Sequence, residues 1–329
     1  MTMKTMKIMN GLMLAALALA LALGQPVWAQ DYPSRQIQFI VPSTPGTTGD
    51  QLARLLGQRI SQRWNVPVVV DNKVGAGGMI GIEAGAKANP DGYTFLFSAT
   101  AFSTLPALRA QLPYDPVKGF ASVILLGKSP LVLAVSNGVP ARSAREFIDY
   151  AHKRPPGSLN YGSPGVGSVH HLSMEMFKQQ TGLFLTHIPY KGTAGALNDL
   201  AAGHVEASVV VLQTILPLAQ SGKVRVLAVM GPDRVSQLPQ VPTLAQAGVP
   251  KVVSEAWFGV TAPAGTPAAL TARMNAEINA LLALPDIKEA IAKMGVEPAG
   301  GEPRELDAQV RAELKMWSDI VKRGKIAAE

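Results

Sequence analysis

Cysteine is absent from this chain of 329 residues. Without cysteine no disulfide can form, so burial of a hydrophobic core must stabilise the fold by itself. A chain of this length can bury such a core, and we expect it to divide the core between two lobes. The absence also excludes a lipid anchor on an N-terminal cysteine, because that anchor needs a thiol at the cleavage site.

Long runs of one charge are absent as well. The formal net charge is +7, but no five consecutive residues carry charges of one sign. Stretches that interleave basic and aromatic side chains are missing too, which argues against binding of nucleic acid. The mild positive charge is spread along the chain, where it can help to attract anions.

No apolar run is long enough to cross a membrane comfortably. The longest, Gly11 to Gly24, has 14 residues, whereas a spanning helix needs about 20. Lys4 and Lys7 precede this run, and Val27 to Ala29 end it with a small residue. This pattern predicts a signal peptide over residues 1–29, cleaved after Ala29; a membrane anchor or a core helix is the alternative. We expect export to the periplasm, since a soluble exported protein without an anchor needs a closed compartment.

A catalytic constellation is also missing. No serine lies in a G-x-S-x-G elbow, the turn that exposes the nucleophile of many hydrolases. Ser163 and Ser168 lie near His170 and His171 in sequence, but adjacency in sequence is not the geometry of a triad. We therefore predict that the protein is not an enzyme, with a periplasmic serine hydrolase as the weakest alternative.

Cofactor and metal motifs are incomplete. Gly75–Gly81 partly matches a dinucleotide-binding fingerprint, but Ile80 occupies the position of its third glycine. We interpret this segment as a turn that opens a helix, and we expect no cofactor. His171 and Glu175 are four residues apart on a predicted helix, but no third ligand is evident, so we expect no metal.

Short apolar runs alternate with helical patterns along the chain. Most runs consist of Val, Ile, Leu and Phe without regular alternation, as expected for parallel strands that are covered on both faces. The predicted strands are Ile37–Val41, Val66–Val70, Thr94–Phe97, Val123–Leu126, Leu131–Val135, Val209–Leu212, Val224–Met230 and Phe258–Ala262. Helical stripes between them predict an α/β fold with parallel sheets.

Two apolar segments are candidates for crossing between lobes. They are Val123 to Val135, interrupted by Gly127–Pro130, and the segment around Trp257 to Pro263. They predict one lobe of residues 30–126 plus 254–329 and a second lobe of residues 127–253. Two crossovers form a hinge, and ligands prefer the groove between two lobes.

Two loops share one sequence pattern. Each follows a β-type apolar run, is rich in Gly, Ser, Thr and Pro, and precedes a helix; the first is Pro42–Gly49 and the second is Gly162–Ser168. Such loops leave backbone N–H groups free at a helix N-terminus, where an anion can bind. The alternative is a tight strand-to-helix turn without a ligand.

The first loop offers many hydroxyl groups. Gly46 lets the backbone turn, and Asp50 lies at or just inside the helix start, where a carboxylate is favoured by the helix dipole. Asp50 therefore caps the helix, orients the loop or meets a polar ligand group. The hydroxyl candidates are Ser43, Thr44, Thr47 and Thr48.

The second loop has the glycine spacing of a P-loop, but Ser168 stands where that motif needs lysine. What remains is a set of N–H and hydroxyl donors, which suits a carboxylate. His171 follows as a further candidate contact. Another polar cluster, Tyr190, Lys191 and Thr193, stands before a predicted short helix; Lys191 could balance an anion, or it is a solvated surface lysine.

Taken together, these segments resemble the Bug, or TctC-type, periplasmic receptors of tripartite tricarboxylate transporters. Each motif is short, but their ordered set extends over essentially the whole mature chain. The motifs are Ile40–Pro42 with Pro45-Gly46 and Asp50, Val69–Asn72, Gly75–Gly81, Asn89–Thr94, Leu112–Pro116, Tyr161–Ser163 with Gly165, Gly167 and Ser168, Pro189–Gly192, Leu238–Thr243, Ala247-Gly248, Trp257–Gly259 and Ala262–Pro267.

The resemblance implies a two-lobed α/β fold of the type II periplasmic binding class, each lobe a mixed, mainly parallel sheet flanked by helices. It also implies that the two loops hold a ligand carboxylate in the cleft between the lobes. Residue by residue it implies Pro45, Gly46 and Asp50 in the first lobe. In the second lobe it implies Ser163, Gly165, Gly167, Ser168, Tyr190, Lys191 and Gly192.

The first loop departs from the family pattern. Ser43 replaces an aromatic residue, and Thr47 replaces the second of two glycines. Because threonine tolerates a positive φ poorly, we expect the loop to take a different path. The missing aromatic side chain opens room and adds a hydroxyl.

These observations predict a monomeric periplasmic solute-binding protein. It captures a small organic carboxylate by hinge closure and passes it to the membrane permease of a tripartite tricarboxylate-type transporter. The alternative role is a sensor that presents its closed form to a membrane-bound kinase.

Overall fold

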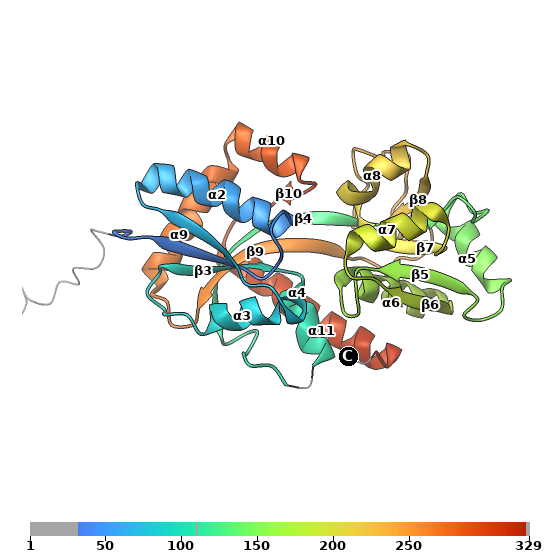
Figure 1. Cartoon of the computed structure of the whole chain (residues 1–329), viewed down its shortest axis with the longest axis horizontal. Helices are drawn as coiled ribbons and strands as arrows, with labels where there is room; N and C mark the ends of the chain where they lie inside the picture. Colours follow the sequence, from blue (N-terminus) through green and yellow to red (C-terminus); the bar gives the residue numbers. More distant parts are fainter. Residues whose placement is uncertain (1–31, 110, 327–329) are drawn as a thin grey trace, which may run out of the picture. The chain divides into compact units, whose positions relative to one another are not determined.

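The computed structural model describes residues 32–109 and 111–326, so the predicted signal peptide lies outside the described residues. The helices and strands below all belong to one compact unit, Gln36–Glu329 (Figure 1). In the described ranges, no helix combines the length and the apolar character that crossing a membrane requires.

The first half of the sheet begins with three parallel strands. β1 lies between the other two and pairs with both. Each strand leads from its carboxyl end into a helix, so these helix N-termini gather at one edge of the sheet. The strands are β1 (Ile37–Val41), β2 (Val68–Asn72) and β3 (Thr94–Ala99), and the helices that follow them are α2 (Thr48–Trp64), the 3-10 turn η2 (Ala76–Gly78) with α3 (Met79–Ala86), and α4 (Ala101–Leu108).

The second half repeats this arrangement. β5 lies between β6 and β7 and is parallel to both. Here too each strand leads into a helix at the carboxyl edge. The strands are β5 (Leu159–Ser163), β6 (Leu185–Pro189) and β7 (Ala207–Val211), and their helices are α6 (Val169–Thr181), α7 (Thr193–Ala202) and α8 (Leu212–Gln220).

Two long strands join the halves. β4 (Phe120–Ser136) runs antiparallel to β9 (Glu255–Pro263) over Phe120–Pro130, and then pairs antiparallel with β7 and with β8 (Val224–Val229). The short strand β10 (Glu297–Pro298) also pairs with β4. The resulting order, β2-β1-β3-β9-β4-β7-β5-β6, is a mixed sheet, as predicted. The residue boundaries predicted for the two lobes stay a prediction.

The predicted break at Gly127–Pro130 is wrong, because β4 continues through it. A Cβ at Gly127 would collide with the carbonyl oxygen of Glu297 on β10, so glycine is needed for close backbone approach rather than for a turn. Pro130 lies where the strand changes partners, opposite the first residue of β9. The N–H that proline lacks at this point therefore interrupts no long run of hydrogen bonds between strands.

Helices cover both faces of each half. On the first half, α2, α9 (Ala268–Leu282) and α10 (Pro285–Lys293) enclose one hydrophobic cluster, while α3, α4 and α11 (Pro303–Gly324) cover the other face. On the second half, α5 (Ala144–His152) and α6 cover one face and α7 and α8 the other. Burial on both faces explains why the strands are continuous apolar runs.

Helix α11 belongs to both halves. Its first turns bury Leu306 and Val310 against the first half, whereas Trp317 and Val321 pack with the core of the second half. The helix therefore contacts both halves beside the strand pair β4 and β9.

Several boundaries differ from the sequence prediction. Ser143 caps α5 and accepts a hydrogen bond from Glu146 N at 3.2 Å. Thr266 donates its hydroxyl proton to the Pro263 carbonyl, and α9 begins at Ala268, after Pro267. β2 runs from Val68 to Asn72 instead of Val66 to Val70. The sequence of β6 contains no apolar run long enough to predict a strand there.

Candidate functional site

Both predicted loops lie where the fold gathers helix N-termini. The first follows β1 and the second follows β5, each the central strand of its parallel set. In Figure 1 the loops lead into α2 and α6. Ligands of open α/β sheets bind outside the carboxyl ends of the strands, where free N–H groups and helix dipoles point at them.

Asp50 braces the first loop from inside the helix. Its side chain is 2 % exposed, and one carboxylate oxygen accepts the Gly46 N–H at 2.8 Å and the Arg54 Nε–H at 3.0 Å. The other oxygen accepts from Asn72 Nδ2 at 2.9 Å and lies 2.9 Å from an Arg54 amino group. Its acceptor capacity is used within the loop, so Asp50 orients the loop.

The charge of Asp50 is stabilised by these partners. Burial alone would raise the pKa of the carboxyl, but hydrogen bonds from Arg54, Gly46 and Asn72 outweigh burial and lower that pKa. Asn72 also donates to the Ser43 carbonyl at 3.0 Å, so the end of β2 holds both ends of the loop.

Thr47 fits the loop without strain. Its φ is −69°, in the extended region, while Gly46 takes the left-handed conformation with φ +85°. Ser43 Oγ and Thr47 Oγ1 are 2.7 Å apart, and Thr47 donates to the Thr44 carbonyl at 2.9 Å. The loop thus needs glycine at only one of these two positions.

The other first-loop candidates lie on its open side. Thr44, Pro45 and Gly46 are exposed, and Thr48 is the first residue of α2. A Cβ at Gly49 would lie 4.0 Å from Phe258 Cδ1, so the ring of Phe258 on β9 stands beside the first turn of α2. Phe258 supplies an apolar surface next to a hydroxyl-lined loop.

Ser163 and Ser168 hold the second loop by its backbone. Ser163 Oγ donates to the Gly165 carbonyl at 3.1 Å and accepts the Gly165 N–H at 3.2 Å. Ser168 Oγ donates to the same carbonyl at 2.8 Å and accepts the His171 N–H at 3.2 Å as the N-cap of α6. Both hydroxyls therefore stabilise the loop first of all.

His171 takes one of the loop's N–H donors. The Gly167 N–H donates to His171 Nδ1 at 3.0 Å, and His171 is 4 % exposed. Glu175, four residues after His171, accepts from the Tyr161 hydroxyl and from Lys178, both at 2.5 Å. Within the described residues no group of His, Asp and Glu side chains is placed to hold a metal ion.

The loop after β6 lies beside the second loop. The Tyr190 N–H donates to the Ser163 carbonyl at 2.9 Å, and the Gly192 N–H donates to the Pro164 carbonyl at 3.2 Å. Tyr190 directs its hydroxyl to Asp199 at 2.6 Å. Lys191 is exposed, and Thr193 is the first residue of α7 after Gly192, its N-cap with φ +116°.

Helix α4 connects the two loops through side-chain packing. Gly78 approaches the Pro42 carbonyl closely, since a Cβ there would lie 3.2 Å from it, and a Cβ at Gly77 would lie 3.5 Å from Leu105. At its other end, Leu108 packs so closely on Gly167 that a Cβ there would collide with Leu108 Cδ1. The first and second loops are thus in contact through η2 and α4.

The best geometry for a serine hydrolase is Ser163 with His187, whose Nε2 lies 2.6 Å from Ser163 Oγ. Ser163 is 0 % exposed, and its hydroxyl is also bonded to Gly165. The imidazole of His187 stacks on the phenol ring of Tyr161 and on the imidazole of His171. This arrangement supports the shape of the loop.

Sequence reasoning missed the residues that brace the loops from other strands. Asn72 and His187 lie at or near the ends of β2 and β6, far from the loops in sequence. It also missed the N-terminus of α8, where Gln213 packs on Gly295 of the other half. β2, β6 and β7 end at the same sheet edges as β1 and β5. Recognising this would have indicated Asn72, His187 and the N-terminus of α8.

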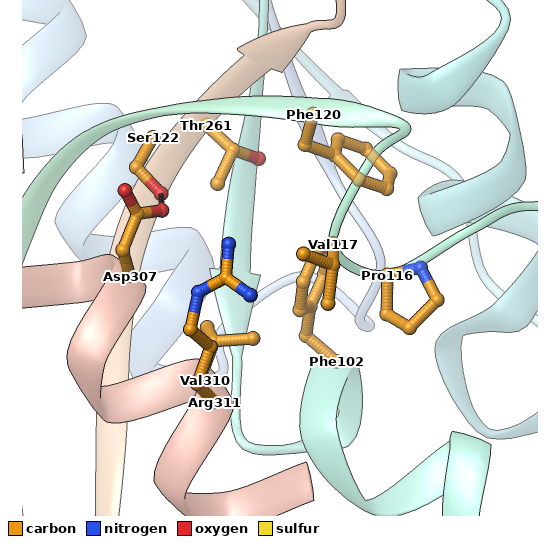
Figure 2. Close-up of a pocket in the computed structure, with 9 residues that line it drawn as sticks. All are labelled: Phe102, Pro116, Val117, Phe120, Ser122, Thr261, Asp307, Val310 and Arg311. Carbon is orange, nitrogen blue, oxygen red and sulfur yellow. Dashed lines mark hydrogen bonds between the residues drawn. The ribbon is translucent and has the colours of Figure 1, made fainter. Parts of the chain in front are cut away.

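Three cavities of the described residues lie outside the two loops. A small one, about 20 Å³, lies in the first half between β4, β9, α4 and α11; Figure 2 shows Thr261, Phe120 and Arg311 around it. Larger ones, about 440 and 170 Å³, lie beside α5 and between α8 and α10. The loops are surface features at the strand ends, and neither of them lines these cavities.

This chain is similar to known proteins over most of its length. Residues 52–326 match the TctC family, described as the tripartite tricarboxylate transporter family receptor. Protein BugT of Bordetella pertussis is 36% identical over 299 residues, which cover 90% of this chain and 91% of BugT. A UPF0065 protein in the tcbD-tcbE intergenic region of a Pseudomonas species is 35% identical over 291 residues, 88% of this chain and 86% of that protein.

Solved structures are similar over nearly their whole length. R. palustris Rpa4515 with adipate has a TM-score of 0.80 and 38% identity, covering 90% of this chain and 99% of that chain. MatC from Rhodopseudomonas palustris with bound malate has a TM-score of 0.76 and 30% identity, covering 88% and 100%. The periplasmic binding protein BugD has a TM-score of 0.77 and 32% identity, covering 91% and 100%. The predicted two-lobed periplasmic binding fold is confirmed, and the chain belongs to the TctC family of periplasmic solute-binding receptors.

Proposed function

We propose that this chain binds a small organic carboxylate between its two strand-end loops and delivers it to a tripartite tricarboxylate-type permease. The observation that carries the proposal is the equivalent position of Pro42–Asp50 and Gly162–Ser168, each after the central strand of a parallel set. Similar proteins with adipate and with malate support a carboxylate as the ligand class.

The donors for the carboxylate are backbone N–H groups. In the second loop the N–H groups of Gly165 and Gly167 are bonded within the protein. The hydrogen bonds of the described residues use neither the Val166 N–H nor those of Val169 and His170 in the first turn of α6. These three groups, with the positive end of the α6 dipole, are placed to bind a carboxylate.

Lys191 and the hydroxyls of the first loop complete the site. Lys191 is exposed beside Gly192, which is bonded to the second loop. Its ammonium balances the ligand charge, while Thr44 and Thr48 offer hydroxyls from the opposite lobe. Closure of the hinge strands brings the two sets together on one ligand, so the ligand stabilises the closed state. No covalent step is involved, and a monomer suffices.

A thermal-melting screen tests the ligand class. Adipate, malate, citrate and aromatic acids are compared with a sugar and with divalent cations. A ligand at 100 times its Kd raises the free energy of unfolding by about 2.7 kcal/mol, so the right acid gives a clear rise in melting temperature. Tight binding of a sugar or a cation together with no response to any acid contradicts the proposal.

Two matched serine variants test the site. Ser168 caps α6 and Ser143 caps α5 in the same way, each accepting an N–H at 3.2 Å. Ser168→Ala and Ser143→Ala should each cost about 1 kcal/mol of stability, but only Ser168→Ala should weaken binding of the acid. Equal affinities of the two variants would place the ligand elsewhere.

Uptake in cells tests delivery to the permease. Cells that lack this chain should lose uptake of the labelled acid, and wild type should restore it better than Ser168→Ala. Unchanged uptake, with a lost transcriptional response to the acid, would favour the sensor role instead.

A further inference from the structure

The second half of the protein contains a stack of two histidine rings behind the Gly162–Ser168 loop. The ring centroids of His171 and His187 are 4.0 Å apart and their planes are inclined by only 7°. Tyr161 continues the stack, with its ring 4.8 Å from that of His187. The three rings come from α6, β6 and β5, so the stack joins every element that carries the second loop.

Each imidazole holds a different point of the loop. His171 Nδ1 accepts the Gly167 N–H at 3.0 Å, while His187 Nε2 lies 2.6 Å from the hydroxyl of Ser163. The Ser163 hydroxyl in turn holds both the N–H and the carbonyl of Gly165. The two histidines therefore fix Gly165 and Gly167, which have left-handed φ values of +145° and +78°.

The surroundings favour neutral rings. Two imidazolium ions at this spacing would repel each other strongly in a buried site. Burial lowers the pKa of His171 to about 3, helped by the charges of His187 and Lys178. Burial also lowers the pKa of His187 to about 4; Glu175 opposes this shift and Lys178 adds to it. Tyr161 bonds to Glu175 and completes the titratable groups around the stack.

We propose that His171 and His187 are positioning residues for ligand binding: as a neutral stacked pair they hold the Gly162–Ser168 loop in its binding shape without contacting the ligand. This rests on the proposed function of that loop. His171 must carry its proton on Nε2, because Nδ1 accepts the Gly167 N–H. The loop then pays little ordering entropy when the ligand arrives.

Pairs of variants separate the hydrogen bond from the bulk of the ring. His171→Asn keeps an acceptor at the place of Nδ1, and His187→Gln keeps a polar atom at the place of Nε2. His171→Leu and His187→Leu fill similar space but place no polar atom at these positions. His152→Leu on α5 is the matched control, since the His152 ring, which lines the cavity beside α5, bonds to the Thr181 carbonyl and not to the second loop.

Binding of adipate and malate is measured by titration calorimetry at neutral pH, with melting curves to confirm that each variant is folded. The leucine variants should bind at least about tenfold more weakly than wild type. The asparagine and glutamine variants should stay within about threefold, and His152→Leu should match wild type. Leucine variants that bind like wild type, or amide variants that lose as much as leucine variants, overturn the proposal.

A second measurement needs neither ligand nor variant. Nitrogen-detected NMR of histidine-labelled wild type should find His171 as the neutral Nε2–H tautomer, and the Gly167 amide should exchange slowly with solvent. A protonated Nδ1 in His171, or a Gly167 amide that exchanges freely, overturns the proposal even if the leucine variants fail to fold. If no acid binds wild type, the proposed function fails, while this measurement still decides the role of the histidines.

Discussion

The first loop is braced by an ionised carboxylate, whereas the second is braced by neutral imidazoles. Asp50 binds Gly46, Arg54 and Asn72 in the first loop. In the second, His171 binds Gly167 and His187 contacts Ser163. Both arrangements solve one problem, which is to hold a glycine-rich turn still at a helix N-terminus so that some of its N–H groups stay free.

The difference teaches where the specificity of such a site can change. In the first loop the brace lies on the helix that follows and at the end of the next strand, which leaves Ser43 to Thr47 open to substitution. In the second loop the brace is a buried stack of three rings, which ties the loop to the core. We therefore expect substitutions in the first loop to change which ligand is preferred. Changes in the second loop should alter the affinity for every ligand.

The largest effect is expected from Asp50→Ala. The change leaves the Gly46 N–H and the Asn72 amide without their buried acceptor. We expect a loss of about 2–4 kcal/mol in the free energy of unfolding, measured by urea denaturation. Asp149→Ala is the matched control, because Asp149 forms a surface ion pair with Arg145, also four residues away in sequence. This variant should cost under about 0.5 kcal/mol. Similar losses for both variants would show that the Asp50 brace contributes little.

The two left-handed glycines of the loops should respond differently to alanine. Gly46 has φ +85° with nothing near its missing Cβ, so Gly46→Ala should cost only the backbone strain, about 1–2 kcal/mol. At Gly167, φ is +78° and a Cβ collides with Leu108 Cδ1, so Gly167→Ala should cost about 2–4 kcal/mol. Adding Leu108→Ala should recover part of that loss in a double-mutant cycle. Strictly additive costs would contradict the contact between α4 and the second loop.

Acid should weaken the second loop before the first. The pKa values of His170, His171 and His187 are lowered from 6.5 to about 4, 3 and 4. The unfolded chain then binds more protons, so stability is full above pH 6.5 and is lost as the pH falls toward about 4. For one such histidine the loss by pH 5 is about 2 kcal/mol. Asp50 has a lowered pKa, so its contribution is lost only as the pH falls below 3.8.

Denaturation at a series of pH values measures this difference. The free energy of unfolding of wild type should fall steeply between pH 6.5 and about 4, and His171→Asn should flatten that slope by about one proton. Burial raises the pKa of Glu313, so the contribution of this group to stability changes with pH in the opposite direction. Both proteins contain Glu313, so its effect cancels when wild type and His171→Asn are compared. Equal slopes for wild type and variant would exclude a neutral buried His171.

The smallest effect is expected from Thr47→Gly. Thr47 needs no glycine, because its φ is −69°. Glycine would gain freedom in the unfolded chain and would remove the hydroxyl contact with Ser43. We expect a loss of about 0.5–1 kcal/mol and a shift in the relative affinities for adipate and malate, measured by calorimetry. A gain in stability would indicate that the threonine strains the loop.

Much of the fold follows from local patterns in the sequence. β1 is confirmed as Ile37–Val41, and Gly203, in the left-handed conformation, ends α7. The long strand β4 was predicted as two strands, because Gly127 and Pro130 resemble a break. Only the approach of β10, a strand of two residues far along the chain, explains that glycine.

The candidate site could be predicted in its loops but not in its braces. Glycine, serine and threonine between a strand and a helix indicate both loops directly. Asn72 and His187 reach the loops because β2 and β6 pair with β1 and β5, and strand order is not encoded in any local pattern. His171 was predicted as a ligand contact from its position after the second loop; its ring accepts the Gly167 N–H and stacks on His187.

The central claim is that the two loops form two sides of one carboxylate site. Amide NMR of the labelled protein, titrated with the acid that raises the melting temperature most, tests it directly. We predict that signals from residues 43–50 and from residues 162–170 shift together and saturate with one dissociation constant. Shifts confined to one loop, or centred on the cavity between Phe120 and Arg311, would contradict it.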